Sequence, residues 1–270
     1  MRGRSAQAGR PFLRYKRYVL SVLERADSTT ALPRLGGMAR PNGVVIVSER
    51  YWAFAGVDGS LREGRMSKPP EFLQRLPLAR GLVRLAASLG PLFRRSGVAR
   101  PRERWLLLAA VVAPAALAFL PAPWSTVAGG VVVAALLLTI LRGRTLRLHG
   151  AEHRAIAACE ERSLVATWSG EAKPTRFSPR CGTNFAALAF PVTLLADRTP
   201  LPVAFWTPFA VLVFSLAATM EIWRMVQTRG WRLLLLPGLA LQRVTTREPE
   251  LDDTRVAMRA VASVLERELA

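Results

Sequence analysis

The stretch from Trp105 to Leu141, WLLLAAVVAPAALAFLPAPWSTVAGGVVVAALLLTIL, contains no Asp, Glu, Lys or Arg in 37 residues. A single helix of that length would measure about 55 Å, far more than the ~30 Å hydrocarbon core of a bilayer. The prolines of Pro121–Trp124 divide it into two expected spans, Trp105–Leu120 and Ser125–Leu141. Buried helices of a soluble core are the alternative, but such helices rarely lack charge over so long a stretch. The stretch therefore predicts a first membrane hairpin over residues 105–141.

A second charge-poor region, residues 185–220, is interrupted only by Asp197 and Arg198. It predicts a second hairpin with the arms Phe185–Ala196 and Leu201–Met220, and the first arm is short enough to be re-entrant rather than spanning. The expected fold is therefore mainly α-helical and integral to the membrane, with two helical hairpins and about four membrane segments. A small N-terminal antiparallel β element and cytoplasmic helices complete it.

The arginines alternate with these expected spans. Residues 84–104 hold six arginines, residues 142–162 five and residues 224–243 four, whereas the Pro121–Trp124 turn holds none. Positive residues concentrate on the cytoplasmic side of membrane proteins. The alternation predicts a multi-pass protein of the cell's inner (plasma) membrane with an even number of crossings and both termini in the cytoplasm.

The composition limits the classes of partner. The chain of 270 residues has 38 Lys and Arg against 19 Asp and Glu, and 51% of it is apolar. Two cysteines and two histidines exclude a disulfide-stapled fold and a multi-zinc domain. Basic residues beside a membrane favour anionic headgroups by about 1 kcal/mol each, so we expect a bilayer with anionic lipids as the partner. A protein partner or a second copy of the chain stays open, and the charge does not require nucleic acid or a ribosome.

Three regions are expected outside the membrane. The basic region 1–104 contains Phe12–Ala26, which predicts either a basic amphipathic helix on the membrane surface or a flexible tail. A small antiparallel sheet is expected over about residues 42–66 of the same region. A cytoplasmic loop, 142–184, joins the two hairpins, and residues 221–270 are expected to form an interfacial segment and a C-terminal amphipathic helix.

The loop 142–184 carries both histidines of the chain, in the motif HGAEHRAI at residues 149–156. His149 and His153 are four residues apart and share one face of a helix, so their imidazoles can hold one divalent metal ion. Glu152 precedes the second histidine and is suited to act as general base toward a water molecule. The order His-x-x-Glu-His also occurs in inverted zinc peptidases. The motif predicts a divalent metal site, with zinc as the favoured ion and Glu152 as the catalytic residue.

Two residues compete for the place of third ligand. Glu160 follows His153 by seven residues and returns to the same helical face, where it would offer a carboxylate. Cys181 would offer a thiolate, which suits zinc. A reading without metal also exists, because Gly150 weakens a helix by about 1 kcal/mol relative to Ala. In that case His149 would precede the first helical turn and act as a cap.

These blocks resemble the signature of the YqhQ-like bacterial membrane proteins over about residues 35–265. The resemblance rests on HGAEHRAI at residues 149–156 with Glu160 after it, on PRCGTNF at 179–185, and on PGLALQRVTTREP at 237–249. It implies an integral membrane protein that is predicted to be metal-dependent and has no settled substrate.

The family's motif positions carry over to His149, Glu152, His153, Glu160 and Cys181. Many members of the family have a histidine before Pro-Arg-Cys, where this chain has Ser178. The difference removes one possible ligand and makes a three-histidine site impossible within one chain.

The expected function is a metal-dependent, hydrolase-like activity at the cytoplasmic face of the membrane. The alternative is a non-catalytic membrane scaffold or docking protein, with a structural metal and histidine loop and a basic cytoplasmic surface. The two hypotheses differ in the role of Glu152, which only the enzyme requires for its activity.

Overall fold

The computed structural model describes residues 5–93, 97–99, 101–117, 119–121, 124, 127–129, 131–132, 135, 143–198 and 205–270. The chain divides into two compact units that alternate along the sequence. Unit 1 comprises Met1–Arg65, Arg144–Arg176 and Thr246–Ala270, and unit 2 comprises Met66–Gly143 and Phe177–Thr245.

Unit 1 contains a four-stranded antiparallel sheet in which each strand pairs with the next one along the chain. The strands are β1 (Gly36–Arg40), β2 (Gly43–Val47), β3 (Tyr51–Gly56) and β4 (Leu61–Arg65). The sheet expected over about residues 42–66 therefore begins earlier. The reason is that β1 pairs along its whole length with β2, a contact that its glycine-rich sequence did not predict.

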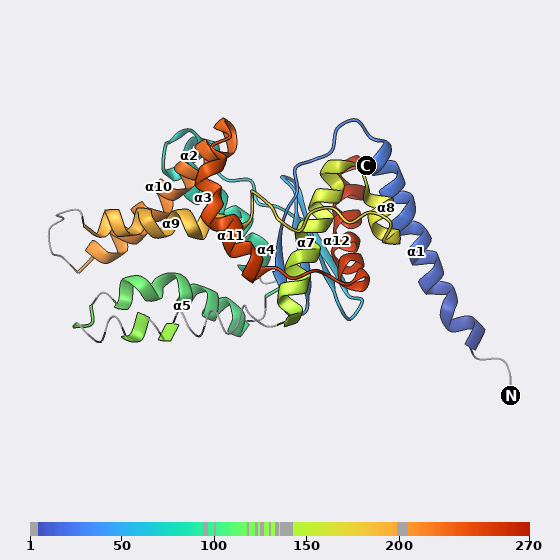
Figure 1. Cartoon of the computed structure of the whole chain (residues 1–270), viewed down its shortest axis with the longest axis horizontal. Helices are drawn as coiled ribbons and strands as arrows, with labels where there is room; N and C mark the ends of the chain where they lie inside the picture. Colours follow the sequence, from blue (N-terminus) through green and yellow to red (C-terminus); the bar gives the residue numbers. More distant parts are fainter. Residues whose placement is uncertain are drawn as a thin grey trace. The chain divides into compact units, whose positions relative to one another are not determined.

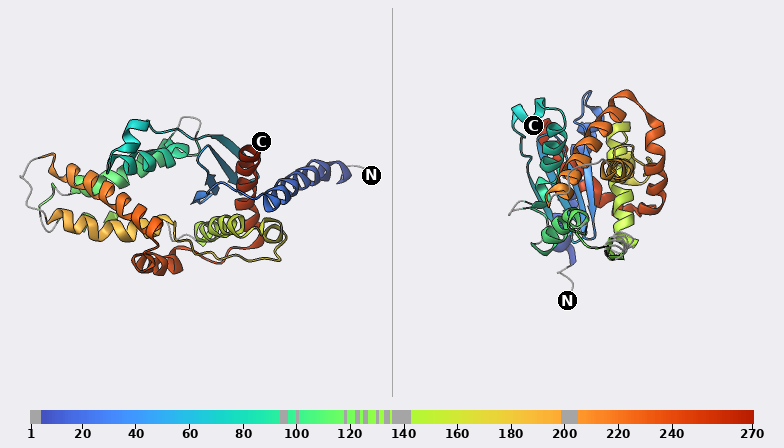
Figure 2. Two further views of the ribbon diagram at one scale, coloured as in Figure 1. Left: turned by 90° about the horizontal axis from the view of Figure 1, so that it is seen from above. Right: turned by 90° about the vertical axis from the view of Figure 1, so that its left-hand side faces the viewer.

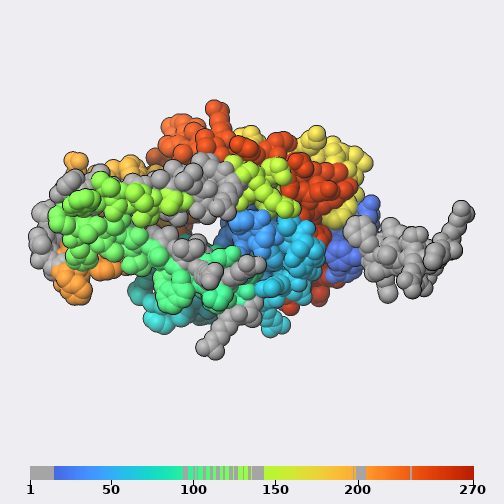
Figure 3. Space-filling model, turned by 90° about the horizontal axis from the view of Figure 1, so that it is seen from below, coloured from blue at the N-terminus to red at the C-terminus, as the bar shows by residue number. Residues whose placement is uncertain are grey.

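Four helices complete unit 1, namely α1 (Ser5–Ser28), α7 (Gly143–Glu161), α8 (Leu164–Ser169) and α12 (Leu251–Leu269). Helix α12 packs against β2 and β3 and also contacts α1 and α8 (Figure 1). In the left view of Figure 2 it lies between the sheet and α1. The space-filling view shows the strands, in blue to cyan, beside the red C-terminal helix (Figure 3). The hydrophobic core of unit 1 lies among these elements.

The apolar side of α1 belongs to this core. Val19, Val22 and Leu23 are almost fully buried and form part of the main hydrophobic cluster. Lys16 and Arg17 are exposed on the other side of the helix. The segment is thus a helix whose apolar residues pack against the protein itself.

The elements with defined bounds in the described part of unit 2 are helices. They are α2 (Glu71–Arg75), α3 (Ala79–Ser88), α4 (Gly90–Phe93), α5 (Pro101–Leu117), α9 (Gly182–Asp197), α10 (Thr207–Arg229), the 3-10 helix η1 (Arg232–Leu235) and α11 (Leu236–Thr245). Helix α9 contacts α10 and α11, and α10 contacts α3 and α5 (Figure 1). Leu188, Val226 and Leu235 form a small buried cluster between them.

The expected architecture of two membrane hairpins and about four membrane segments is wrong. In the described part of the chain, one helix is long and apolar enough to cross a membrane, and it is α10. Helices α5 and α9 have 17 and 16 residues, which at 1.5 Å per residue gives about 26 Å and 24 Å, less than a ~30 Å core. A stretch without charged residues shows that the sequence is apolar, but it does not determine where a helix begins and ends. Most of the expected span Ser125–Leu141 lies outside the described residues.

The second predicted hairpin also has different bounds. Its second arm was expected over Leu201–Met220, but α10 continues to Arg229 and residues 199–204 lie outside the described part. Glu221 accordingly lies within the helix, where it forms an ion pair with Arg80 of α3.

Candidate metal centre

Both histidines lie on one face of α7, as expected from their spacing of four residues. Their ring centroids are 4.5 Å apart, with an angle of 64° between the ring planes. The alternative in which His149 precedes the first turn is wrong, because α7 begins at Gly143 and continues without a break to Glu161.

Gly150, between the two histidines, is required by the close packing of α7 against the segment before α12. A Cβ atom at this position would overlap the carbonyl oxygen of Arg247 and approach the ring of Pro249 to 3.3 Å. The backbone N–H of Arg247 also donates a hydrogen bond to the carbonyl of Leu146, at 3.0 Å. The glycine therefore lets the segment before α12 cross α7 in close contact. This gain in packing offsets its low helix propensity.

His153 is held by the backbone of the segment after α8. Its Nδ1 lies 2.7 Å from the carbonyl oxygen of Arg176. Since a carbonyl only accepts hydrogen bonds, Nδ1 donates this one, and in the neutral imidazole Nε2 then has a lone pair. Nε2 is buried and makes no hydrogen bond within the described part of the chain. A second partner that fixes the tautomer in this way is typical of histidines that ligate metals.

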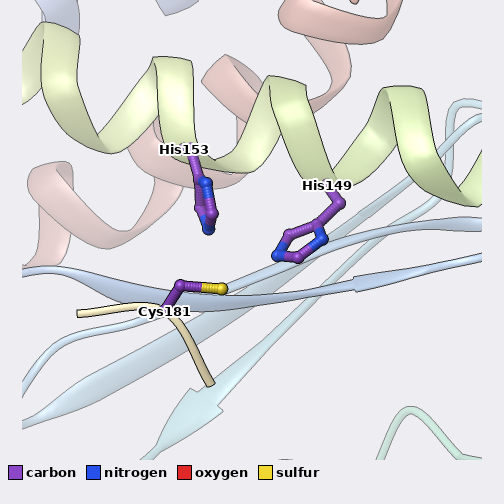
Figure 4. A group of neighbouring side chains, drawn as sticks. All are labelled: His149, His153 and Cys181. Atoms are coloured by element: carbon purple, nitrogen blue, oxygen red, sulfur yellow. The ribbon is translucent and has the colours of Figure 1, made fainter. Parts of the chain in front are cut away.

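Cys181 supplies a third donor atom. One ligand atom from each of His149, His153 and Cys181 can be chosen so that all three lie within 4.8 Å of one another (Figure 4). Cys181 follows Arg176, the hydrogen-bond partner of His153, by five residues. The chain therefore limits the distance between Arg176 and Cys181 to about 18 Å. Cys181 is the N-cap residue of α9, and its sulfur accepts hydrogen bonds from the backbone N–H and the hydroxyl of Thr183. This group of two imidazoles and one thiol can hold a metal ion.

The other proposed ligand, Glu160, lies elsewhere. It is exposed near the end of α7 and does not belong to the group of His149, His153 and Cys181 in the described residues. The second cysteine, Cys159, lies in the hydrophobic core of unit 1, where it packs as a small apolar residue.

Glu152 is buried between α7 and β1. Its side chain lies so close to Gly37 that a Cβ atom there would be 2.8 Å from the Cγ of Glu152. Burial raises the pKa of Glu152 to about 7, against the smaller lowering effects of His149 and of a hydrogen bond from the backbone of Ala39. At neutral pH this carboxyl group can therefore either hold or release a proton.

An ion-pair network that the sequence analysis did not anticipate fixes the segment that contacts His153. The buried Arg154 donates to the carbonyl of Pro174 at 3.1 Å and to Glu248 at 2.6 Å. Glu248 is also 3.6 Å from the guanidinium of Arg176, which in turn donates to the carbonyl of Thr246. The run at residues 237–249 contains two residues of this network, Thr246 and Glu248, but no spacing rule links them to Arg154 and Arg176.

The family described as "Protein of unknown function (DUF1385)" matches residues 127–267, which is more than half of the chain. The chain belongs to this family. The residues matched by the family include α7 with both histidines, Cys181 and all but the end of α12, whereas the sheet with Gly37 precedes them.

The family match agrees with the expected resemblance to YqhQ-like proteins. A stretch of 136 residues, 47% of the chain, is 30% identical to "Uncharacterized protein YqhQ" of Bacillus subtilis (strain 168). This stretch covers 42% of the relative, so the chain spans less than half the length of that protein. No solved structure matches the chain.

Proposed function

We propose that the protein binds a divalent metal ion, preferentially zinc, through His149, His153 and Cys181. The observation that carries the proposal is the buried Nε2 of His153, which has a lone pair and no hydrogen-bond partner among the described residues. A buried polar atom without a partner costs free energy. A metal ion at this position would satisfy it.

The donor set fits zinc in kind and in spacing. Zinc prefers imidazole nitrogen and thiolate sulfur at about 2.0 and 2.3 Å, so neighbouring donors of a tetrahedral site lie about 3–4 Å apart. The donor atoms of the three residues lie within 4.8 Å of one another, and small side-chain rotations would bring them to that distance. Three protein donors leave one coordination position open, as in catalytic zinc sites.

We propose further that the site is hydrolytic and that Glu152 is its general base. A metal ion at such a site polarises a water molecule or a carbonyl group. Glu152 is next to His153 in the sequence and interacts electrostatically with His149. Its pKa of about 7 suits a carboxylate that takes a proton and returns it at neutral pH.

The second candidate function is a non-catalytic scaffold with a structural metal. The burial of His153 and Cys181 favours it, because an ion at a buried site would be shielded from a substrate. The substitution Glu152→Gln separates the two proposals. In a hydrolase it leaves the metal content intact and abolishes turnover, whereas in a scaffold it leaves both metal content and function nearly unchanged.

Metal analysis of the purified protein tests the binding proposal. We expect about one zinc ion per chain in the wild type and its loss in the double variant His149→Ala, His153→Ala. The matched control is Glu160→Ala, which changes a carboxylate on the same helix outside the group of three and is expected to retain the metal. Wild-type metal content in the double variant would refute the proposal.

We also propose that α10 anchors the protein in a bilayer that contains anionic lipids. Only 22% of its most apolar stretch is buried, whereas the core helix of a soluble protein would be mostly buried. Its large side chains Val213 and Phe214 are more than half exposed. Arg229 ends the helix and lies 5.8 Å from the ring of Trp231. Aromatic and basic residues of this kind are typical of membrane–water interfaces and of the cytoplasmic side.

Flotation of the purified chain with liposomes tests the anchor. We expect Phe214→Asp to reduce recovery with vesicles of phosphatidylcholine and phosphatidylglycerol, because it places a charge at an exposed apolar position of α10. Leu61→Asp, at an exposed apolar residue of β4, is the control and should float like the wild type. Equal recovery of Phe214→Asp and Leu61→Asp would contradict the proposal.

A further inference from the structure

Gln242 of α11 is fully buried and holds the backbone of the turn that leads to Cys181. Its Nε2 donates to the carbonyl of Ser178 at 2.8 Å, and its Oε1 accepts a hydrogen bond from the N–H of Ser178 at 2.8 Å. Both backbone polar groups of one residue are thus bound by a single side-chain amide.

The carbonyl of Ser178 is also the start of the turn that ends at Cys181. It accepts a hydrogen bond from the backbone N–H of Cys181 at 3.3 Å, and one from the Nδ2 of Asn184 at 2.9 Å. The carbonyl of Cys181 accepts in turn from the N–H of Asn184 at 3.0 Å. The position of the cysteine backbone therefore depends on Ser178, which Gln242 fixes.

The close packing of α11 against the start of α9 supports this connection. Gly238 precedes Gln242 by four residues and so lies on the same face of α11. A Cβ atom at Gly238 would overlap both the backbone and the side chain of Asn184. The two helices therefore approach closely at the point where Gln242 reaches the turn.

We propose that Gln242 is a positioning residue of the metal site, which acts by fixing the turn that presents the Cys181 sulfur. The inference rests on the proposed metal-binding function and deepens it. Gln242 does not belong to the group of ligand atoms, so its effect on the metal is transmitted through Cys181. Loss of such an outer partner typically weakens metal affinity by about 10- to 100-fold.

The test is a titration of the full-length chain with Co²⁺ alone, followed through the charge-transfer band of a thiolate bound to cobalt. Gln242→Met keeps the approximate volume of the side chain and removes both hydrogen bonds to Ser178. Gln227→Met is the matched control, because Gln227 is exposed and donates one hydrogen bond, at 3.0 Å, to the neighbouring Pro179. We expect affinity about 10- to 100-fold weaker and a reduced thiolate band for the Gln242 variant, and nearly wild-type values for the control.

A double-mutant cycle separates positioning from general destabilisation. If Gln242 acts through Cys181, Gln242→Met causes no further loss of Co²⁺ affinity once Cys181→Ala is present. Gln242→Glu is the conservative variant. It retains the acceptor for the N–H of Ser178 and is expected to bind Co²⁺ with intermediate affinity.

The possible results are distinguishable. Wild-type affinity and a full thiolate band in both Gln242 variants would overturn the positioning role but leave the metal site in place. An equal loss with and without Cys181 would also overturn it, since the effect would then not pass through the cysteine. A wild-type chain that gives no thiolate band with Co²⁺ would overturn the proposed metal site itself.

Discussion

The carboxyl group of Glu152 shows how one residue's surroundings change its chemistry. The side chain is 5% exposed, and removal from water raises its pKa from 4.5 to about 7. Between these two values the folded chain keeps a proton that the unfolded chain has lost. The free energy of unfolding must then decrease as the pH rises through this range, by about 3 kcal/mol in total.

The prediction concerns Glu152→Gln in metal-free protein. In this variant the free energy of unfolding should not show the decrease with rising pH that Glu152 causes, because a glutamine does not titrate. Urea unfolding at about pH 5 and about pH 7.5 measures the difference, with the wild type as reference. A variant with the same pH dependence as the wild type would show that Glu152 is not the group responsible.

At the same scale, Gly150 is predicted to tolerate no side chain. We expect Gly150→Ala to lower the free energy of unfolding by about 1–3 kcal/mol, the usual range for overpacking, because its methyl group would overlap the carbonyl of Arg247. Gly182→Ala is the control, since a Cβ atom there meets no described atom within 4 Å. Chemical denaturation of both variants provides the comparison, and equal stability would contradict the close crossing of the two segments.

The candidate site was predictable only in part from its residues. Helical periodicity places His149 and His153 on one face, and this rule needs no tertiary information. The choice between Glu160 and Cys181 stayed open because Cys181 lies on another element. The carbonyl of Arg176, which orients His153, could not be predicted, since every residue has such a carbonyl and only the fold selects one.

At the scale of elements, α1 shows that an amphipathic pattern does not identify its partner. The basic, amphipathic sequence is compatible with a membrane surface, but Leu23 is completely buried within the core of unit 1. We predict that Leu23→Ala lowers the free energy of unfolding by about 2–5 kcal/mol, the range for large-to-small substitutions in a core. Tyr18→Ala, at a residue of the same helix that is 43% exposed, should change it by much less. If the two variants have equal unfolding curves, α1 does not contribute to the core.

Helix lengths explain why the number of membrane segments was mispredicted. Composition reveals apolar segments, but the ends of α5 and α9 depend on local signals that the charge gaps did not contain. Helix α9 includes Pro191 and is capped by Cys181 at its N-terminus, and it ends near Asp197. The hydropathy of the sequence therefore indicates where the apolar regions are, but it does not predict how many helices are long enough to cross a membrane.

At the scale of the whole molecule, the two units are each assembled from separate parts of the sequence. The contacts of α12 with β2 and β3 join residues about 200 positions apart, as the hydrogen bond from Arg259 of α12 to the carbonyl of Gly56 in β3 illustrates. No local pattern predicts such a pairing, because many amphipathic helices would fit the same sheet. The sequence alone therefore predicts consecutive regions, whereas the core is formed by segments that are distant along the chain.

We propose that two imidazoles and one thiolate of this chain hold one metal ion together. X-ray absorption at the zinc edge of the zinc-loaded, full-length protein tests it most directly. We expect one sulfur at about 2.3 Å and nitrogen or oxygen donors at about 2.0–2.1 Å, with the sulfur absent in Cys181→Ala. A spectrum of the wild type that contains only oxygen donors, or a sulfur shell that persists in Cys181→Ala, would contradict it.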